Sequence, residues 1–380
     1  MTQPKDFGFD ADAALLRDTA RQFLLDQLPT DALHRLVASD HDPHRAPANN
    51  WNPALWRQIV DLGWTTVAVP ENAGGAGLPL VALAALAEEV GRAALPSPFL
   101  ATAAAALVLR QCPGDAARAL LGEIAGGRTA TLAVTPRSGA WETAACDLHL
   151  ENGRLHGSAW YVQDAAKAEV LIAKAVHRDG LALVAVPVTA AGVERVPDSI
   201  LDLTRDQAHV HFHGVAVDDA QMLAAPGSGA PALDAAWPGV LTLVAADLCG
   251  AAEWLLQTTA EYARTREQFG RTIGFFQAIK HPLVNLMVQL DQARSLTYNA
   301  ACAIEHEPER AAACARMAKA AASDVAAFGS NRAIQFHGGI GFTWECAVHI
   351  YTKRQKHNQI LYGDASYQRA RLAELLLGQE

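Results

Sequence analysis

One carboxylate stands in a strongly apolar run of this 380-residue sequence. Asp247 lies within LTLVAADLCGAA, residues 241–252. Burying an unpaired carboxylate there would raise its pKa, because a charged group is costly to transfer out of water. A carboxyl group of this kind is suited to accepting a proton. The alternative is a helix carboxylate that faces water or pairs with a neighbouring arginine.

Three histidines alternate along a stretch with strand character. His209, His211 and His213 occupy every second position, which places their imidazoles on one face of a strand. Such neighbours could share a metal ion, but no carboxylate completes a zinc set, and Val210 and Phe212 supply the core face. We therefore expect a structural strand and no metal site.

A glycine-rich turn follows a long helical segment in IQFHGGIGFTWE, residues 334–345. Glycine has no Cβ, so the backbone there can touch a ligand or simply take a positive φ between two helices. No strand precedes this turn and G-x-G-x-x-G is absent, so a Rossmann-type nucleotide site is not predicted.

Composition limits the class of protein. Hydrophobic residues make up 51% and charged residues 19% of the sequence, as in folded globular proteins of two or three domains. The 31 Lys and Arg against 40 Asp and Glu give a net charge of −9, which argues against nucleic acid or an anionic membrane as the main partner. The most apolar stretch, residues 99–109, is too short to span a membrane. Six scattered cysteines and an acidic N-terminus favour a cytoplasmic location.

The periodicity of apolar residues divides the sequence into three predicted domains. Residues 1–127 have helical spacing, and residues 128–229 have short β-branched runs typical of a β-barrel or sandwich. Residues 230–380 return to helical spacing in segments long enough for an antiparallel bundle, at 241–266, 276–306 and 308–336. The predicted fold class is therefore α+β, in the order helices, sheet, helices.

Four stretches in this order resemble the acyl-CoA dehydrogenase family. They are LWRQIVDLGWTTVAVPENAGGAG at 55–77 with EEVGRA at 88–93, VHFHGVAVDDAQML at 210–223, YARTREQFGRTIGFFQAIKH at 262–281, and the glycine-rich stretch at 334–345. Together they span nearly the whole chain, and the third is the most specific.

The resemblance implies an FAD held at a subunit interface. Arg266, Gln268 and Phe269 would reach the FAD of the neighbouring protomer, where an arginine fork suits the pyrophosphate. The remaining residues that the resemblance assigns to the cofactor are Val134, Thr135, Tyr161, Gln277, Gln335, Gly338, Gly339 and Asp364.

The resemblance also implies α,β-desaturation of an acyl-CoA thioester, in which a base removes a proton from Cα and a hydride passes from Cβ to flavin N5. The position that usually carries the catalytic glutamate holds Tyr362, which is a poor base with a pKa near 10. The backbone N–H of residue 362 can still polarise the thioester. Asp247 is the first candidate base and Asp364 the second. The third option is a chain without a base, completed by a partner subunit.

Three features are similar to those of small subunits of bacterial α2β2 acyl-CoA dehydrogenases. They are GFTWE, the altered loop after Thr135 and the Tyr-Gly-Asp run at 362–364. Those relatives act on steroid-derived CoA esters or on dicarboxylic acyl-CoAs such as pimeloyl-CoA. The implied electron acceptor is an electron-transfer flavoprotein. A homotetramer, an acyl-CoA oxidase and a non-catalytic, flavin-holding subunit remain alternatives.

Overall fold

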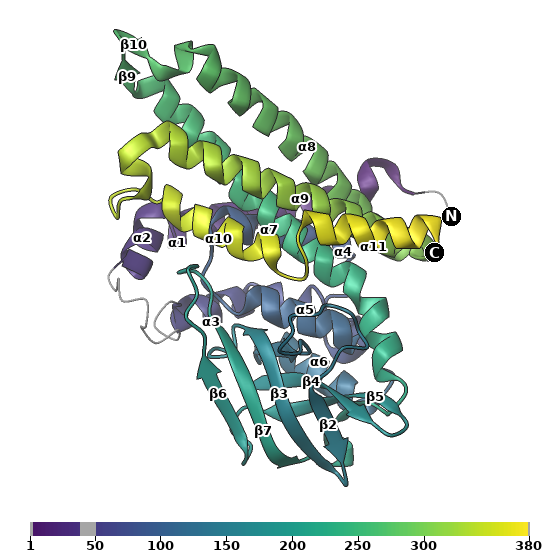
Figure 1. The fold of residues 1–380 in the computed structure, drawn as a ribbon. Helices are drawn as coiled ribbons and strands as arrows, with labels where there is room; N and C mark the ends of the chain where they lie inside the picture. The colour runs from purple at the N-terminus through teal and green to yellow at the C-terminus, as the bar shows by residue number, and fades with distance from the viewer. Residues whose placement is uncertain (1–2, 39–50, 379–380) are drawn as a thin grey trace.

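A computed structural model describes residues 3–38 and 51–378. The chain forms helices, then a sheet, then longer helices, which confirms the predicted order (Figure 1). The helices before the sheet are α1 (Ala11–Gln27), α2 (Thr30–Ala38), α3 (Pro53–Asp61), α4 (Leu80–Arg92), α5 (Phe99–Leu109) and α6 (Asp115–Ala125).

The central strands form one open, mixed sheet. They are β1 (Ala130–Ala133), β2 (Leu148–Glu151), β3 (Arg154–Gln163), β4 (Val170–His177), β5 (Gly180–Pro187), β6 (Val193–Pro197), β7 (Gln207–Ala216) and β8 (Met222–Ala224). The strand order is β6-β7-β3-β2-β4-β5-β8, and β1 and β2 both run parallel to β4. Because β6 and β8, at the two ends of this path, do not pair with each other in the described residues, the sheet is not closed into a barrel. The predicted class, a β domain between two helical domains, is confirmed.

The C-terminal helices are α7 (Gly229–Thr265), α8 (Gln277–His306), α9 (Pro308–His337), α10 (Val348–Ile360) and α11 (Ala365–Leu377). A small hairpin of β9 (Glu267–Gln268) and β10 (Arg271–Thr272) joins α7 to α8. The bounds of α8 and α9 match the prediction to within one residue, whereas α7 begins well before Leu241 and continues through Pro238.

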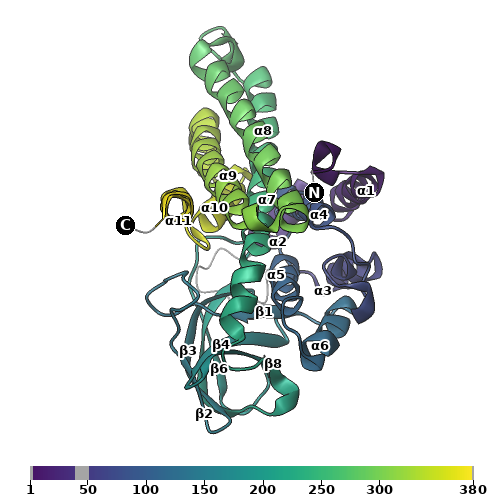
Figure 2. The ribbon, with the colours of Figure 1, turned by 90° about the vertical axis from the view of Figure 1, so that its right-hand side faces the viewer.

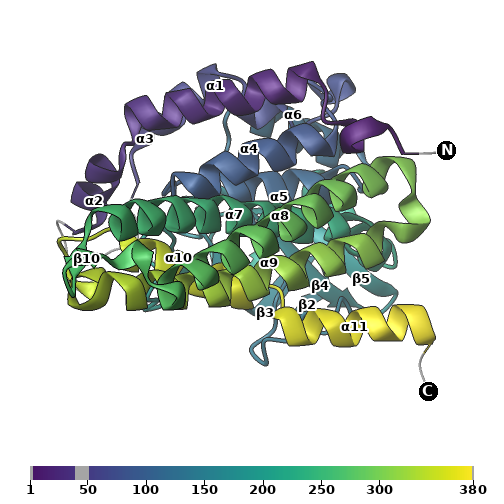
Figure 3. The same cartoon turned by 90° about the horizontal axis from the view of Figure 1, so that it is seen from above.

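The helices and the sheet pack as successive layers. Seen from above, α1, α4, α7, α9 and α11 follow one another across the molecule, and each contacts the next (Figure 3). Figure 2 shows α3, α5 and α6 beside the sheet, where α5 packs on β1 and α6 on β8. Helix α7 is long and apolar enough to cross a membrane, but most of that segment is buried within the protein.

Two glycines bring the backbones of α4 and α7 into direct contact. A Cβ on Gly250 would lie 1.8 Å from the carbonyl oxygen of Glu88, and a Cβ on Gly91 would lie 2.1 Å from that of Asp247. Neither distance leaves room for a side chain. The close approach fixes how α7, which carries much of the candidate site, sits against the N-terminal helices.

A methyl group at this contact is expected to separate the two helices. Gly250→Ala should lower the free energy of unfolding by about 3 kcal/mol, because backbone atoms must move to admit the Cβ. Gly114→Ala is the matched control, since its Cβ would meet nothing closer than 3.7 Å. Denaturant titration of both variants measures the difference, and equal stability would show that α4 and α7 do not touch as described.

Candidate functional site

The residues assigned to the far end of FAD gather at one end of the bundle. The β9–β10 hairpin carries Gln268 and Phe269, with Arg266 just before it, and all three are exposed, Phe269 to 90%. The ring of Tyr262, at the end of α7, stacks on His337 at the end of α9 with centroids 4.3 Å apart. This stack holds the hairpin and the glycine turn at the same end of the molecule.

The glycine turn and its neighbours present open backbone. A Cβ on Gly338 or Gly339 would meet nothing within 4 Å, so a ligand could approach the main chain there. Gln335 on α9 and Gln277 at the start of α8 are exposed nearby. The Arg266 side chain makes no hydrogen bond or ion pair with any described residue. These free donors and the open turn fit an anionic, extended cofactor such as FAD.

The residues assigned to the isoalloxazine ring lie on the sheet, far from this hairpin in the same chain (Figure 1). Val134 and Thr135 follow β1, and the Thr135 carbonyl accepts a hydrogen bond of 2.9 Å from the Trp160 N–H. Tyr161 is 37% exposed beside them. The structure therefore divides the candidate FAD residues between two distant regions of one protomer.

Gln163 is a residue at this site that sequence reasoning missed. Its amide nitrogen donates to the Tyr161 carbonyl, and its Oε1 lies 2.6 Å from Nε2 of His357 on α10. The pair ties β3 to the C-terminal helices beside Tyr161. The sequence gave no indication of this contact, because Gln163 and His357 are 194 residues apart.

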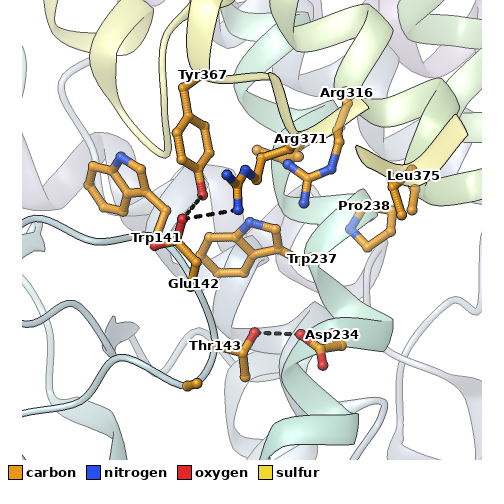
Figure 4. Close-up of a pocket in the computed structure, with 13 residues that line it drawn as sticks. Trp141, Glu142, Thr143, Asp234, Trp237, Pro238, Arg316, Tyr367, Arg371 and Leu375 are labelled. Carbon is orange, nitrogen blue, oxygen red and sulfur yellow. Dashed lines mark hydrogen bonds and ion pairs between the residues drawn. The ribbon is translucent and has the colours of Figure 1, made fainter. Parts of the chain in front are cut away.

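Two cavities lie near Tyr362, which lines one of them and contacts the wall of the other. The outer cavity, about 440 Å³, lies between the loop after β1, the start of α7, α9 and α11 (Figure 4). The inner pocket, about 30 Å³, is lined by apolar residues of α5 and α7, by Tyr362, and by polar side chains that include Asp164 and Arg205. The Tyr362 ring is 8% exposed and meets Trp141 and Trp237, both in the outer wall, at centroid distances of 5.4 and 5.0 Å. Tyr362 therefore connects the inner pocket to the aromatic wall of the outer cavity.

The backbone of residue 362 is held in a strained conformation by its surroundings. Tyr362 has φ of 58°, in the left-handed region that costs energy for a non-glycine residue. Gln368 donates to the Tyr362 carbonyl at 2.6 Å, and the Lys319 ammonium donates to the carbonyls of Gln359 and Gly363. Burial lowers the pKa of Lys319 to about 7, while three accepting oxygens favour its protonated form. Burial raises the pKa of Tyr362 above its ordinary value, so it is a still poorer base.

Asp247 is paired with arginine, which is the alternative that the sequence left open beside an unpaired carboxylate. Its side chain is fully buried and accepts from Arg354 Nε at 3.0 Å and NH2 at 2.5 Å, from Arg205 at 3.3 Å and from Asn358 at 2.5 Å. It lines neither cavity, although Leu243 and Val244, one turn earlier on α7, line the inner pocket. Its oxygens are already occupied, which argues against the base role that the sequence favoured.

Other carboxylates near the cavities are engaged as well. Asp364 accepts from the Tyr367 N–H at 2.9 Å and so caps α11. In the inner wall, Asp164 pairs with Lys167 at 2.8 Å and Arg205 at 3.6 Å. In the outer wall, Glu142 accepts from Tyr367 OH at 3.0 Å and Asp234 accepts from Thr143. Among the described residues, neither cavity wall contains a carboxylate without a partner.

The three alternating histidines of β7 have structural roles. His209, His211 and His213 face outward on β7, bonded to Asp198, Ser158 and Glu194 respectively. Within residues 3–38 and 51–378 no group of three His, Cys, Asp or Glu side chains is placed to hold a metal ion.

The fold thus combines a helix, sheet and helix order with an exposed glycine turn and an aromatic-lined cavity. The family model for the acyl-CoA dehydrogenase N-terminal domain matches residues 10–127, and that for the C-terminal domain matches residues 242–377. The chain belongs to the acyl-CoA dehydrogenase family, whose members are oxidoreductases with FAD as cofactor.

Several relatives match most of the chain. Acyl-CoA dehydrogenase IpdE2 of Mycobacterium tuberculosis is 30% identical over 90% of this chain and 89% of that protein. The solved structure of a Tcur3481-Tcur3483 steroid ACAD variant has a TM-score of 0.85 at 29% identity, covering 96% of this chain and 98% of that one. The ChsE4-ChsE5 complex from M. tuberculosis has a TM-score of 0.86 at 24% identity, covering 99% and 100%.

Removing the Asp247 charge should destabilise the fold. Asp247→Asn leaves Arg354 buried without a carboxylate, and breaking a buried pair in this way costs about 3–5 kcal/mol. Asp291→Asn is the control, because that carboxylate is 67% exposed and its pairing with Arg294 is worth little. Thermal unfolding compares the two variants. A stable Asp247→Asn protein that loses activity would restore Asp247 as the candidate base.

Acid should destabilise the protein partly through His349. Both ring nitrogens of His349 are buried without a hydrogen-bond partner among the described residues, and burial lowers its pKa to about 4. As pH falls from about 6.5 to 4, His349 binds a proton in the unfolded chain but not in the folded chain. The free energy of unfolding therefore falls by roughly 2 kcal/mol. His349→Leu should remove this part of the acid dependence of unfolding. The same change at exposed His149 should leave it intact.

Proposed function

We propose that this chain is one subunit of a heteromeric FAD-dependent acyl-CoA dehydrogenase, in which a carboxylate outside this chain takes the Cα proton. The single observation behind this choice is Tyr362. By resemblance it occupies the position of the family's usual base, and it lines an inner pocket of only about 30 Å³. That volume holds about one water molecule, so an acyl group whose thioester meets residue 362 would lie outside this pocket.

The FAD residues support a cofactor shared between subunits. The β9–β10 hairpin lies far from the sheet that carries Tyr161 within one chain, so a single FAD would contact one set of residues from each of two protomers (Figure 1). Arg266 would bind the pyrophosphate through its fork of donors, and Tyr161 would lie against the ring. FAD, when bound, supplies the acceptor for the hydride that leaves Cβ.

The thioester would be activated by the main chain. In the proposed reaction the N–H of residue 362 donates to the thioester carbonyl and stabilises the charge that develops there as the Cα proton leaves. Lys319 and Gln368 hold this loop through the carbonyls on either side of that N–H. The arrangement works with tyrosine at this position, because the donor is the backbone.

The proposed assembly is an α2β2 tetramer, with a homotetramer as the alternative. Val284, Met287 and Val288 are each about half exposed along one face of α8. Three apolar side chains at helical spacing favour a subunit interface there. A structural relative is the ChsE4-ChsE5 complex, which contains two named components. Six free cysteines are consistent with the cytoplasmic location that we propose.

The proposed substrate is a bulky acyl-CoA, with electrons passing to an electron-transfer flavoprotein. A relative at 29% identity is a steroid ACAD, which favours a steroid-derived CoA ester over a dicarboxylic one. Comparing the rates at which electron-transfer flavoprotein and air reoxidise the reduced enzyme distinguishes this acceptor from oxygen. Rapid recovery of oxidised flavin in air alone would indicate an acyl-CoA oxidase.

Replacing Tyr362 tests where the base resides. The wild-type chain purified without other subunits should bind FAD between two of its own copies and should not bleach when acyl-CoA is added anaerobically. Tyr362→Glu should bleach slowly with a short acyl-CoA such as butyryl-CoA, because it adds a carboxylate and enlarges the inner pocket. Tyr362→Gln, of equal size but without a base, should stay oxidised.

Flavin absorbance before and after mixing gives the result. Bleaching by the wild-type chain on its own would show that it carries its own base and would overturn the heteromeric proposal. Co-purification with a second acyl-CoA dehydrogenase chain, followed by bleaching of the complex, would support it.

A further inference from the structure

A chain of hydrogen bonds runs from the C-terminal helices through the sheet to its outer face. His357 Nε2, on α10, lies 2.6 Å from Gln163 Oε1, and the Gln163 amide nitrogen donates to Gln207 Oε1 at 2.9 Å. Gln207 Nε2 donates to Asp198 Oδ2 at 2.8 Å, and the other Asp198 oxygen lies 2.9 Å from His209 Nδ1. The chain thus crosses β3, β7 and the segment after β6, and these three strands are neighbours in the sheet (Figure 1).

The two ends of this chain fix the direction of its bonds. A carboxylate can only accept a hydrogen bond, so Asp198 holds Gln207 with its amide nitrogen toward the carboxylate and its oxygen toward Gln163. That oxygen and the Tyr161 carbonyl, at 3.0 Å, both accept from the Gln163 amide nitrogen. The Gln163 oxygen is left to accept from His357, whose Nε2 therefore carries the proton.

The chain holds a strained bulge in β3. The pairing of β3 with β7 shifts register between Ala159 and Val162, and Tyr161 has φ of 56°, in the left-handed region. Such a backbone persists only where its surroundings hold it. The Gln163 amide holds the Tyr161 carbonyl directly, and Gln207 holds Gln163 in turn. The outer face of the sheet is therefore connected to the residue assigned to the isoalloxazine ring.

Asp198 selects one of two orientations of the Gln207 amide. Without the carboxylate this amide is free to turn over, and its nitrogen would then face the nitrogen of Gln163. Two donors cannot bond to each other, so Gln163 would lose a partner. Gln163 is only 7% exposed, so little water is available to replace that bond. The contact with the Tyr161 carbonyl would loosen as a result.

We propose that Asp198 is a positioning residue for the flavin ring, which acts through Gln207 and Gln163 on the bulge that presents Tyr161 to FAD. The inference rests on the proposed function, in which Tyr161 lies against the ring. Asp198 lines neither cavity, so its effect is carried by the orientation of two amides. Its loss would weaken the flavin contact without removing any group that touches the cofactor.

Four single variants test the chain. Asp198→Leu removes the acceptor and Gln207→Leu removes the middle link. Asp198→Asn is the conservative variant, because its amide oxygen still accepts from Gln207 while its nitrogen donates to the His209 tautomer with a free Nδ1. Glu194→Leu is the matched control, since Glu194 lies on β6 and is also paired with a histidine, His213 at 3.2 Å, but that pair is outside the chain of bonds.

Two measurements on the full-length holoprotein report the two steps. Hydrogen–deuterium exchange in a peptide covering residues 157–165 reports the bulge, and the Kd for FAD with the visible flavin spectrum reports the ring contact. Asp198→Leu and Gln207→Leu should each raise exchange there, shift the flavin bands and weaken FAD binding by about 3- to 10-fold, the range for one hydrogen bond. The double variant should lose no more than either one, because both residues act in one chain. Asp198→Asn and Glu194→Leu should behave as the wild type does.

Three results would overturn the proposal. The first is unchanged FAD affinity and flavin spectrum in Asp198→Leu, whether or not exchange rises, because the chain would then stabilise the sheet alone. The second is an equal loss of affinity in Glu194→Leu, and the third is an Asp198→Asn variant as weak as Asp198→Leu. If Asp198→Leu does not fold, as judged by its thermal unfolding, Gln207→Leu is read in the same way.

Bleaching of the flavin by acyl-CoA tests the proposed function separately. A complex that bleaches, with an Asp198→Leu variant that binds FAD as the wild type does, would reject the positioning role alone. Weakened FAD binding in that variant, in a complex that no acyl-CoA bleaches, would leave the positioning role in place and reject the dehydrogenase subunit.

Discussion

The arrangement of this molecule depends on one buried ion pair, between Asp247 on α7 and Arg354 on α10. The Arg354 guanidinium is fully buried and also donates to Thr204 Oγ1 at 2.8 Å, on the segment between β6 and β7, and to the Leu95 carbonyl at 3.5 Å. One side chain therefore touches the N-terminal helices, the sheet region and the bundle. A buried pair adds little net stability, but each partner requires the other. The pair constrains how the three parts fit together.

The position of α10 that this pair sets also decides the geometry of the candidate site. Asn358 reaches Asp247, and His357 reaches Gln163 at the end of β3. The loop that follows α10 is then held from α9 by Lys319 and carries Tyr362 between the two cavities. The same carboxylate that the sequence suggested for proton transfer thus acts at a distance, by fixing the helix before that loop.

Local signals predicted the fold well where they were strong. Long apolar periodicity placed α8 and α9 to within one residue, because bundle helices repeat the same pattern over many turns. Pro238 concealed the first turns of α7, since a proline inside a helix is unfavourable unless packing compensates. The polar edge strand β6 and the short strand β8 show no clear alternation of apolar and polar residues. The sequence therefore could not distinguish an open sheet from a barrel.

The site was predictable only in part. Motif resemblance assigned Arg266 and the glycine turn to the cofactor, and the structure leaves both exposed at one end of the bundle. It could not show that Asp247 is paired, since Arg354 lies 107 residues further along the chain. The outer cavity was also missed. Its walls come from the loop after β1, α7, α9 and α11, and no single stretch of sequence carries its pattern.

The distance between the β9–β10 hairpin and Tyr161 has a consequence for how the protein would be handled and regulated. If one FAD needs a set of residues from each of two protomers, cofactor affinity follows the subunit concentration by mass action. Dilution would release flavin and subunits together, and newly made chains would stay empty until they met a partner. The flavin content of the protein would then report the fraction of chains that are assembled, as well as the supply of cofactor.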